Sequence, residues 1–118
     1  MRRRREVIGR LHATFQEVNE RHFAGLLPTL PIYLGRLGTG RAKVRELAHL
    51  WVDDDTGAPR YLKFDEEIAL TSDWSDLRET LVHEMVHLWQ SVQGWKVDHG
   101  PEFKRMAKRL GISERAID

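Results

Sequence analysis

The chain has 118 residues, of which 41% are hydrophobic and 31% charged, and its formal net charge is +1. A chain of this length is expected to form one domain, which buries roughly two-thirds of its unfolded surface. The composition is that of a globular protein and argues against intrinsic disorder. Because the sequence has no cysteine, disulfides, thiolate catalysis and cysteine-ligated zinc are excluded, and a transition metal would need His, Asp or Glu ligands.

Charge is unevenly distributed along the chain. Residues 1–45 have ten Arg or Lys and three acidic residues, for a net charge of +7. Residues 46–90 have three basic and eleven acidic residues (net −8), and residues 91–118 have six basic and four acidic residues (net +2). A basic flank of this kind suits an anionic partner such as DNA, although many charged segments are simply solvated. The candidate nucleic-acid contacts are Arg2, Arg3, Arg4, Arg5, Arg41, Lys43 and Arg45.

The basic residues at the N-terminus are not followed by an apolar signal-peptide segment, and no apolar run reaches transmembrane length. We therefore expect one domain over residues 1–118, with residues 1–5 as a flexible basic tail. We also expect a cytoplasmic monomer with no membrane contact, associated with the nucleoid if it binds DNA.

The first predicted element is an amphipathic helix from Glu6 to about Ala24. Its apolar residues recur at near-helical spacing, and Gly25 provides a stop signal. Segments 31–34, 46–52 and 60–70 are rich in aromatic, aliphatic and β-branched residues. Turn-forming residues separate them at 35–40 and 53–59, so we predict a small, mainly antiparallel three-stranded sheet.

A second long helix is predicted from Trp74 to about Val92. Capping side chains at residues 71–73 precede it, apolar residues repeat at intervals of three and four, and Gly94 ends it. A last helix begins near Pro101, where proline suits the first helical position, and ends at Gly111. The predicted fold class is α+β, with helices packed against a small sheet.

Residues 83–87 read His-Glu-Met-Val-His, which is the pattern H-E-x-x-H. Histidines four residues apart on a helix lie about 40° apart around its axis, so both imidazoles can reach one metal ion. The apolar residues occupy roughly the opposite half of the helix (Trp74, Leu77, Leu81, Val82, Met85, Val86, Leu88 and Trp89). The pattern therefore predicts one packed face and one face that presents His83 and His87 to a metal.

Glu84 is placed beside such a metal rather than bound to it. Its predicted role is that of a general base that takes a proton from a water molecule activated by Zn²⁺ and passes it to the leaving amine. Three protein ligands with a fourth open position are typical of catalytic zinc.

The third ligand is predicted between Gly94 and the last helix. His99 follows His87 by twelve residues and stands immediately before a helix start, so a chain reversal can return it to the histidine face. Asp98 and Glu102 are competing candidates, and spacing ranks His99 first.

The remaining histidines, His12, His22 and His49, have no partner at ligand spacing and are interpreted as surface or capping residues. Trp51 is expected in the core of the sheet.

Segments 81–87 and 98–104 (DHGPEFK) together resemble the paired signature of the SprT-like zinc metallopeptidase family, which includes Spartan-type proteases of DNA–protein crosslinks. Segment 18–23 with the Leu-Leu-Pro at 26–28 is similar to the N-x-x-x-F and LP opening of that family. The resemblance extends from about residue 11 to residue 110. Without cysteine, the chain cannot form the C-terminal zinc ribbon of many relatives, and it departs from them in this respect.

The resemblance implies that His83, His87 and His99 bind Zn²⁺ and that Glu84 is the catalytic acid/base. It also implies a zincin-like minimal core and action on DNA-associated proteins. The predicted function is that of a zinc metalloendopeptidase with protein or peptide substrates and with DNA as a second partner. The alternatives are a DNA-binding module with a structural metal site and a zinc hydrolase without proteolytic activity.

Overall fold

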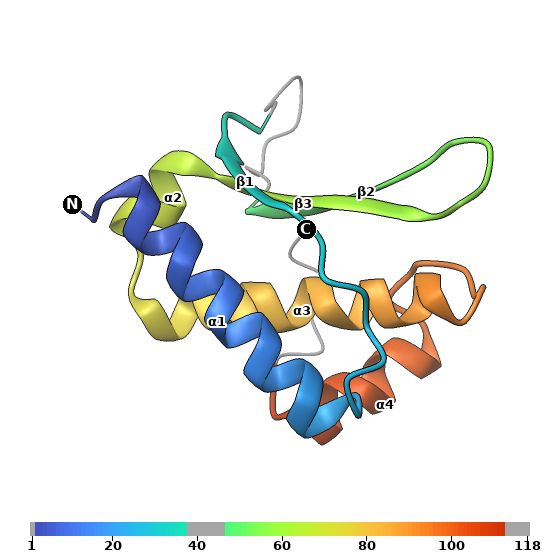
Figure 1. Ribbon diagram of the computed structural model, residues 1–118. Coiled ribbons are helices and arrows are strands. Elements are labelled where there is room, and N and C mark those ends of the chain that lie inside the picture. The colour runs from blue at the N-terminus through green and yellow to red at the C-terminus, as the bar shows by residue number, and fades with distance from the viewer. Residues whose placement is uncertain (1, 38–46, 113–118) are drawn as a thin grey trace.

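The structure is a computed structural model that describes residues 2–37 and 47–112. The described elements, in chain order, are α1 (Arg4–His22), β1 (Ile32–Gly35), β2 (Ala48–Val52), β3 (Pro59–Asp65), α2 (Glu66–Thr71), α3 (Trp74–Val92) and α4 (Pro101–Leu110). This confirms the predicted α+β class. Helices α1 and α3 lie under one face of the sheet, and α4 packs against α3 (Figure 1).

The sheet is mixed, with strand order β1-β3-β2. Strand β2 pairs antiparallel with β3 through the hairpin at residues 53–58, as the turn residues predicted, whereas β1 pairs parallel with β3. The sequence favoured a mainly antiparallel sheet because hairpin turns are visible locally. Parallel pairing joins strands distant in sequence and has no local signature.

Segment 60–70 was expected to be extended throughout, and this was wrong for its second half. Strand β3 ends at Asp65 and helix α2 follows directly. The Asp65 carboxylate accepts a hydrogen bond from the Ile68 backbone N–H at 3.1 Å, which is a helix N-cap. Acidic residues at 66 and 67 favour the first helical turn. The apolar run at 68–70 masked this start signal.

The hydrophobic core lies between the sheet and helices α1 and α3. Its most buried members come from all of these elements and include Leu11, Phe15, Leu62, Phe64, Leu81 and Met85. No helix in the described part of the chain is both long and apolar enough to cross a membrane.

Asn19 is a polar residue within this core and fixes the segment that follows α1. Its side-chain amide donates to the Leu27 carbonyl at 2.9 Å, and its carbonyl oxygen accepts from the Leu27 backbone N–H at 3.0 Å. The residue is only 4% exposed. Both backbone groups of Leu27 are therefore satisfied by one side chain, which accounts for an asparagine at this spacing from the Leu-Leu-Pro segment.

Candidate metal centre

Helix α3 brings His83, Glu84 and His87 to one side of its central turns. All three residues are buried, with 3%, 1% and 4% of their surface exposed. The sequence predicted a ligand face opposite a packed face, but residues 81–88 are buried all the way round the helix. The reason is tertiary, since β2 and α4 both pack on α3.

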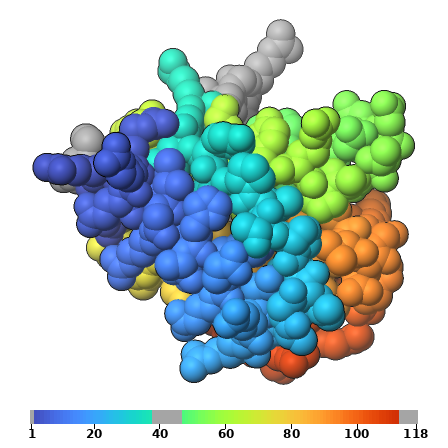
Figure 2. All heavy atoms as spheres, in the orientation of Figure 1, coloured from blue at the N-terminus to red at the C-terminus, as the bar shows by residue number. Residues whose placement is uncertain are grey.

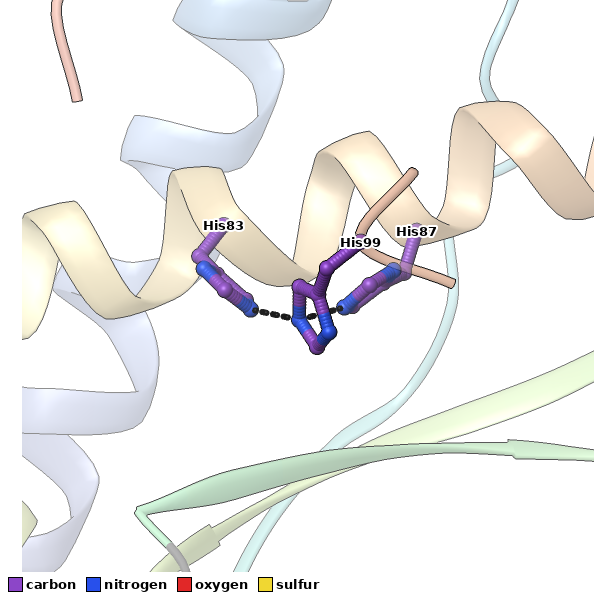
Figure 3. A group of neighbouring side chains, drawn as sticks. All are labelled: His83, His87 and His99. Atoms are coloured by element: carbon purple, nitrogen blue, oxygen red, sulfur yellow. Dashed lines mark hydrogen bonds between the residues drawn. The ribbon is translucent and has the colours of Figure 1, made fainter. Parts of the chain in front are cut away.

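The third histidine reaches the site through a chain reversal after α3. Gly94 adopts a left-handed conformation with φ +76°, and the backbone N–H groups of Gly94 and Trp95 donate to the carbonyls of Ser91 and Gln90. The chain then returns along α3 and places His99 just before α4. In Figure 3 the imidazole of His99 lies between those of His83 and His87.

The three imidazoles lie close enough together to share one metal ion. The Nε2 atom of His99 lies 3.2 Å from the Nε2 atoms of both His83 and His87, and the ligand atoms all lie within 4.8 Å of one another. Nitrogen ligands about 2.0–2.1 Å from a tetrahedral zinc ion would stand roughly 3.3 Å apart. The histidines therefore fit a metal ion without a large rearrangement.

Two neighbours orient these imidazoles. The Gln90 side-chain oxygen lies 3.0 Å from His87 Nδ1, so an N–H at Nδ1 directs the Nε2 lone pair towards the site. Phe103 of α4 is fully buried, and its ring centroid lies 4.8–4.9 Å from the centroids of all three imidazoles. The site is thus held by packing as well as by hydrogen bonding.

Glu84 lies beside the histidines rather than among them. Its Oε2 atom is 4.0 Å from His83 Nε2. Glu84, His87 and His99 line one cavity of about 200 Å³, together with His49, Leu50 and Asp98. A carboxylate and two of the histidines therefore line the same cavity.

Comparison with protein families gives one match, in which the SprT-like family model covers residues 11–117. The chain belongs to the SprT-like family. Comparisons with curated proteins and with solved structures give no significant match.

Of the candidates for the third position, the SprT-like fold brings only His99 to the histidine pair. The Asp98 carboxylate accepts a hydrogen bond from the Gly100 backbone N–H at 3.0 Å and so shapes the turn before α4. Glu102 forms an exposed ion pair with Arg105 at 3.0 Å. Asp98 is among the residues that line the cavity, whereas Glu102 is not.

The basic residues proposed for nucleic-acid contact lie apart from the metal centre. Arg2 donates to the Ser72 carbonyl, and Arg4 donates to the Leu34 carbonyl at 3.2 Å and pairs with Glu66. Figure 2 shows the dark blue start of the chain at the left of the visible face and the orange segment that follows the middle of α3 at the right. The expected flexible tail is therefore tied down from Arg2, and α1 begins at Arg4. Arg3 and Arg5 are exposed.

The other three candidates, Arg41, Lys43 and Arg45, lie outside the described residues.

Sequence reasoning missed two residues of this SprT-like site. His49 was interpreted as a surface or capping residue and is indeed exposed, but it also lines the cavity of the histidine site from β2. Its position beside the site depends on strand pairing and has no signal in the sequence. Gln90 follows His87 by three residues, a spacing at which helix side chains meet, so that signal was available.

Proposed function

We propose that this protein is a zinc-dependent metalloendopeptidase, with His83, His87 and His99 as the zinc ligands and Glu84 as the general base. The observation that carries the proposal is the cavity that Glu84, His87 and His99 line together. Three imidazoles suit zinc, and a site with three protein ligands retains an open position. When bound, zinc would lower the pKa of a water ligand and polarise the substrate carbonyl.

The role of the protein is then to hold ligands and move a proton. Gln90 and Phe103 orient the imidazoles before substrate arrives. Glu84 accepts the proton of the attacking water on its carboxylate and delivers it to the nitrogen of the leaving amine. Burial of Glu84 keeps bulk solvent away from this proton transfer.

Strand β2 supports a polypeptide substrate. Among the described strands it lies at the edge of the sheet, and its residues His49 and Leu50 line the cavity of the histidine site. The Leu47 carbonyl bonds inward to the Asp65 N–H, so by the alternation of a strand the backbone groups of Ala48 and Leu50 point to the other side. An extended peptide that adds to this edge would lie across the metal centre.

DNA-associated proteins are the proposed natural substrates. Family resemblance and the basic N-terminal half support this choice. Lys104, Lys108 and Arg109 are further exposed basic residues, and they lie on α4, the helix whose Phe103 contacts the histidines. Contacts of such residues with phosphate would make DNA binding salt-sensitive.

The test is cleavage of a denatured protein by the purified chain before and after metal removal. Chelation should abolish cleavage and added zinc should restore it. His99→Ala should lose most of its zinc, whereas Asp98→Ala and Glu102→Ala, as matched controls, should retain it. Full zinc occupancy without any cleavage would support a structural metal site instead.

Single-stranded DNA is the second arm of this experiment. If DNA-associated proteins are the substrates, single-stranded DNA in a low-salt buffer should bind the chain or raise the cleavage rate. A rate and a DNA affinity that both stay unchanged when DNA is added would remove DNA from the proposal and leave the peptidase activity intact.

A further inference from the structure

The face of the sheet opposite α1 and α3 has a continuous row of aromatic side chains. Tyr33 on β1 contacts Tyr61 on β3 edge-to-face, with 5.4 Å between the ring centroids. Tyr61 stacks on Trp51 of β2, with 5.3 Å between the centroids and 11° between the ring planes. The rings of Trp51 and His49 meet edge-to-face, with a centroid distance of 4.5 Å. Trp51 was expected in the core but lies on this outer face and is 36% exposed. No helix of the described chain covers this face (Figure 1).

A surface cavity of about 580 Å³ lies at the hairpin end of this face. Its lining includes the rings of Tyr33, Trp51 and Tyr61 together with Asp53, Asp54 and Asp55. One basic residue, Arg60, also lines it. Three carboxylates and one guanidinium give the walls a net charge of −2 (−3 + 1).

The carboxylate of Asp53 already has hydrogen-bond and ion-pair partners within the hairpin. It accepts hydrogen bonds from the backbone N–H groups of Thr56 at 3.0 Å and Asp55 at 2.9 Å, and it pairs with Arg60 at 3.0 Å. These contacts hold the pKa of Asp53 below its ordinary value. Because Asp53 and Arg60 offset each other, the negative charge left over belongs to Asp54 and Asp55.

We infer that this cavity binds the cationic side chain of a lysine or arginine within a polypeptide. The electron-rich faces of tyrosine and tryptophan rings attract cations, and the two uncompensated carboxylates act in the same direction. The same carboxylates repel phosphate. Charge therefore favours a basic peptide over a nucleic acid, although the rings alone would suit either.

Strand β2 connects this cavity to the metal centre. His49 borders the metal cavity and Trp51 lines the aromatic one, and they are two residues apart on the same strand. Two residues of a strand span roughly 6.6 Å. A peptide bound along β2 would thus present one side chain to the aromatic cavity while its backbone crosses the histidines. This part of the inference rests on the proposed peptidase function.

The experiment measures binding without turnover in the Glu84→Gln background. Fluorescence anisotropy compares a labelled peptide of alternating glycine and lysine with peptides that carry glutamine or glutamate in place of lysine. The lysine peptide should bind most tightly. Asp54→Asn combined with Asp55→Asn should weaken its binding about tenfold, as expected for the loss of two surface charge contacts. Trp51→Leu should also weaken it.

The matched control removes the same charge elsewhere. Glu17→Gln combined with Glu20→Gln alters two exposed acids on α1, far from the hairpin in sequence, and should change the affinity less than about twofold. An equal loss in both double variants would mean that only the net charge matters and would overturn the inference. Tighter binding of a labelled oligothymidylate than of the lysine peptide would also overturn it, in favour of a base-stacking surface.

Because peptide binding is measured without cleavage, the result of the binding experiment does not depend on peptidase activity. Loss of lysine-peptide preference with intact zinc-dependent cleavage would refute the cation subsite alone. Retained preference in a chain that never cleaves protein would refute the peptidase alone.

Discussion

Gln90 determines which nitrogen of His87 faces the other two histidines. Its side-chain oxygen is 3.0 Å from His87 Nδ1, and the residue is 1% exposed. In metal sites a partner of this kind fixes the ring orientation and raises the basicity of the ligand nitrogen. Gln90 thus positions His87, and it would act on a bound metal only through that histidine.

Gln90→Leu should lower zinc affinity by about 10- to 100-fold while the fold is retained. Competition with a chromophoric chelator measures this change, and circular dichroism checks the fold. Gln93→Leu is the matched control, because Gln93 is exposed at the end of the same helix. Equal zinc affinity in the two variants would show that Gln90 does not orient His87.

The sequence predicted some, but not all, of the residues that form the histidine site. The H-E-x-x-H spacing identified the residues on α3, because helical periodicity is a local property. Spacing alone left His99 in competition with Asp98 and Glu102, because the path of the returning chain is not encoded in any short segment. The contact of Phe103 with all three imidazoles depends on how α4 packs against α3, which no pattern in the sequence specifies.

At the scale of elements, Asn19 fastens the segment after α1 to the core. Asn19→Ala should destabilise the fold by about 2–4 kcal/mol, because it leaves two buried backbone groups of Leu27 without partners. Urea unfolding measures the change. Gln16→Ala on the same helix removes an exposed hydrogen bond to Thr29 and should cost much less. Equal costs for the two variants would contradict the structural role of Asn19.

The hairpin between β2 and β3 depends on the ionised carboxylate of Asp53. Its pKa is lowered by backbone hydrogen bonds from Thr56 and Asp55 and by Arg60. A lowered pKa in the folded state stabilises the fold at pH values above the unfolded pKa, and this contribution is lost as the pH falls through the folded value. Asp53→Ala should therefore lower the urea midpoint at neutral pH.

The same difference between wild type and Asp53→Ala should shrink in acid, below the ordinary aspartate pKa of about 4. Unfolding curves recorded across this range provide the check. A difference that stays constant with pH would show that the ionised form contributes nothing to the hairpin.

The helices illustrate what sequence patterns can specify about elements. Amphipathic periodicity predicted α1, α3 and α4 close to their observed bounds, because each repeats its apolar residues over several turns. Helix α2 has only 6 residues, which is too short for a clear period, and it was missed. The parallel pairing of β1 with β3 joins residues about thirty apart in the sequence. It was missed because parallel strands have no local turn signal.

For the molecule as a whole, the sheet separates two surfaces that differ in chemistry. The histidine centre lies on α3 beside β2, and the aromatic and acidic cavity lies at the hairpin end of the outer face. His49 lies between them, because it lines the first cavity and its ring contacts that of Trp51 in the second. The basic residues at the N-terminus also differ from the sequence-based expectation of a free basic flank. Arg2 and Arg4 bind carbonyl and carboxylate groups of the fold, so the basic flank is partly consumed by internal contacts.

The central claim is that Glu84 moves the proton in a zinc-dependent cleavage. The most direct test is to measure zinc content and cleavage rate side by side in wild type and Glu84→Gln. Glu84→Gln should bind zinc as wild type does and lose at least about 100-fold in rate, which is the usual contribution of a general base. Cleavage at the wild-type rate in zinc-loaded Glu84→Gln would contradict the claim.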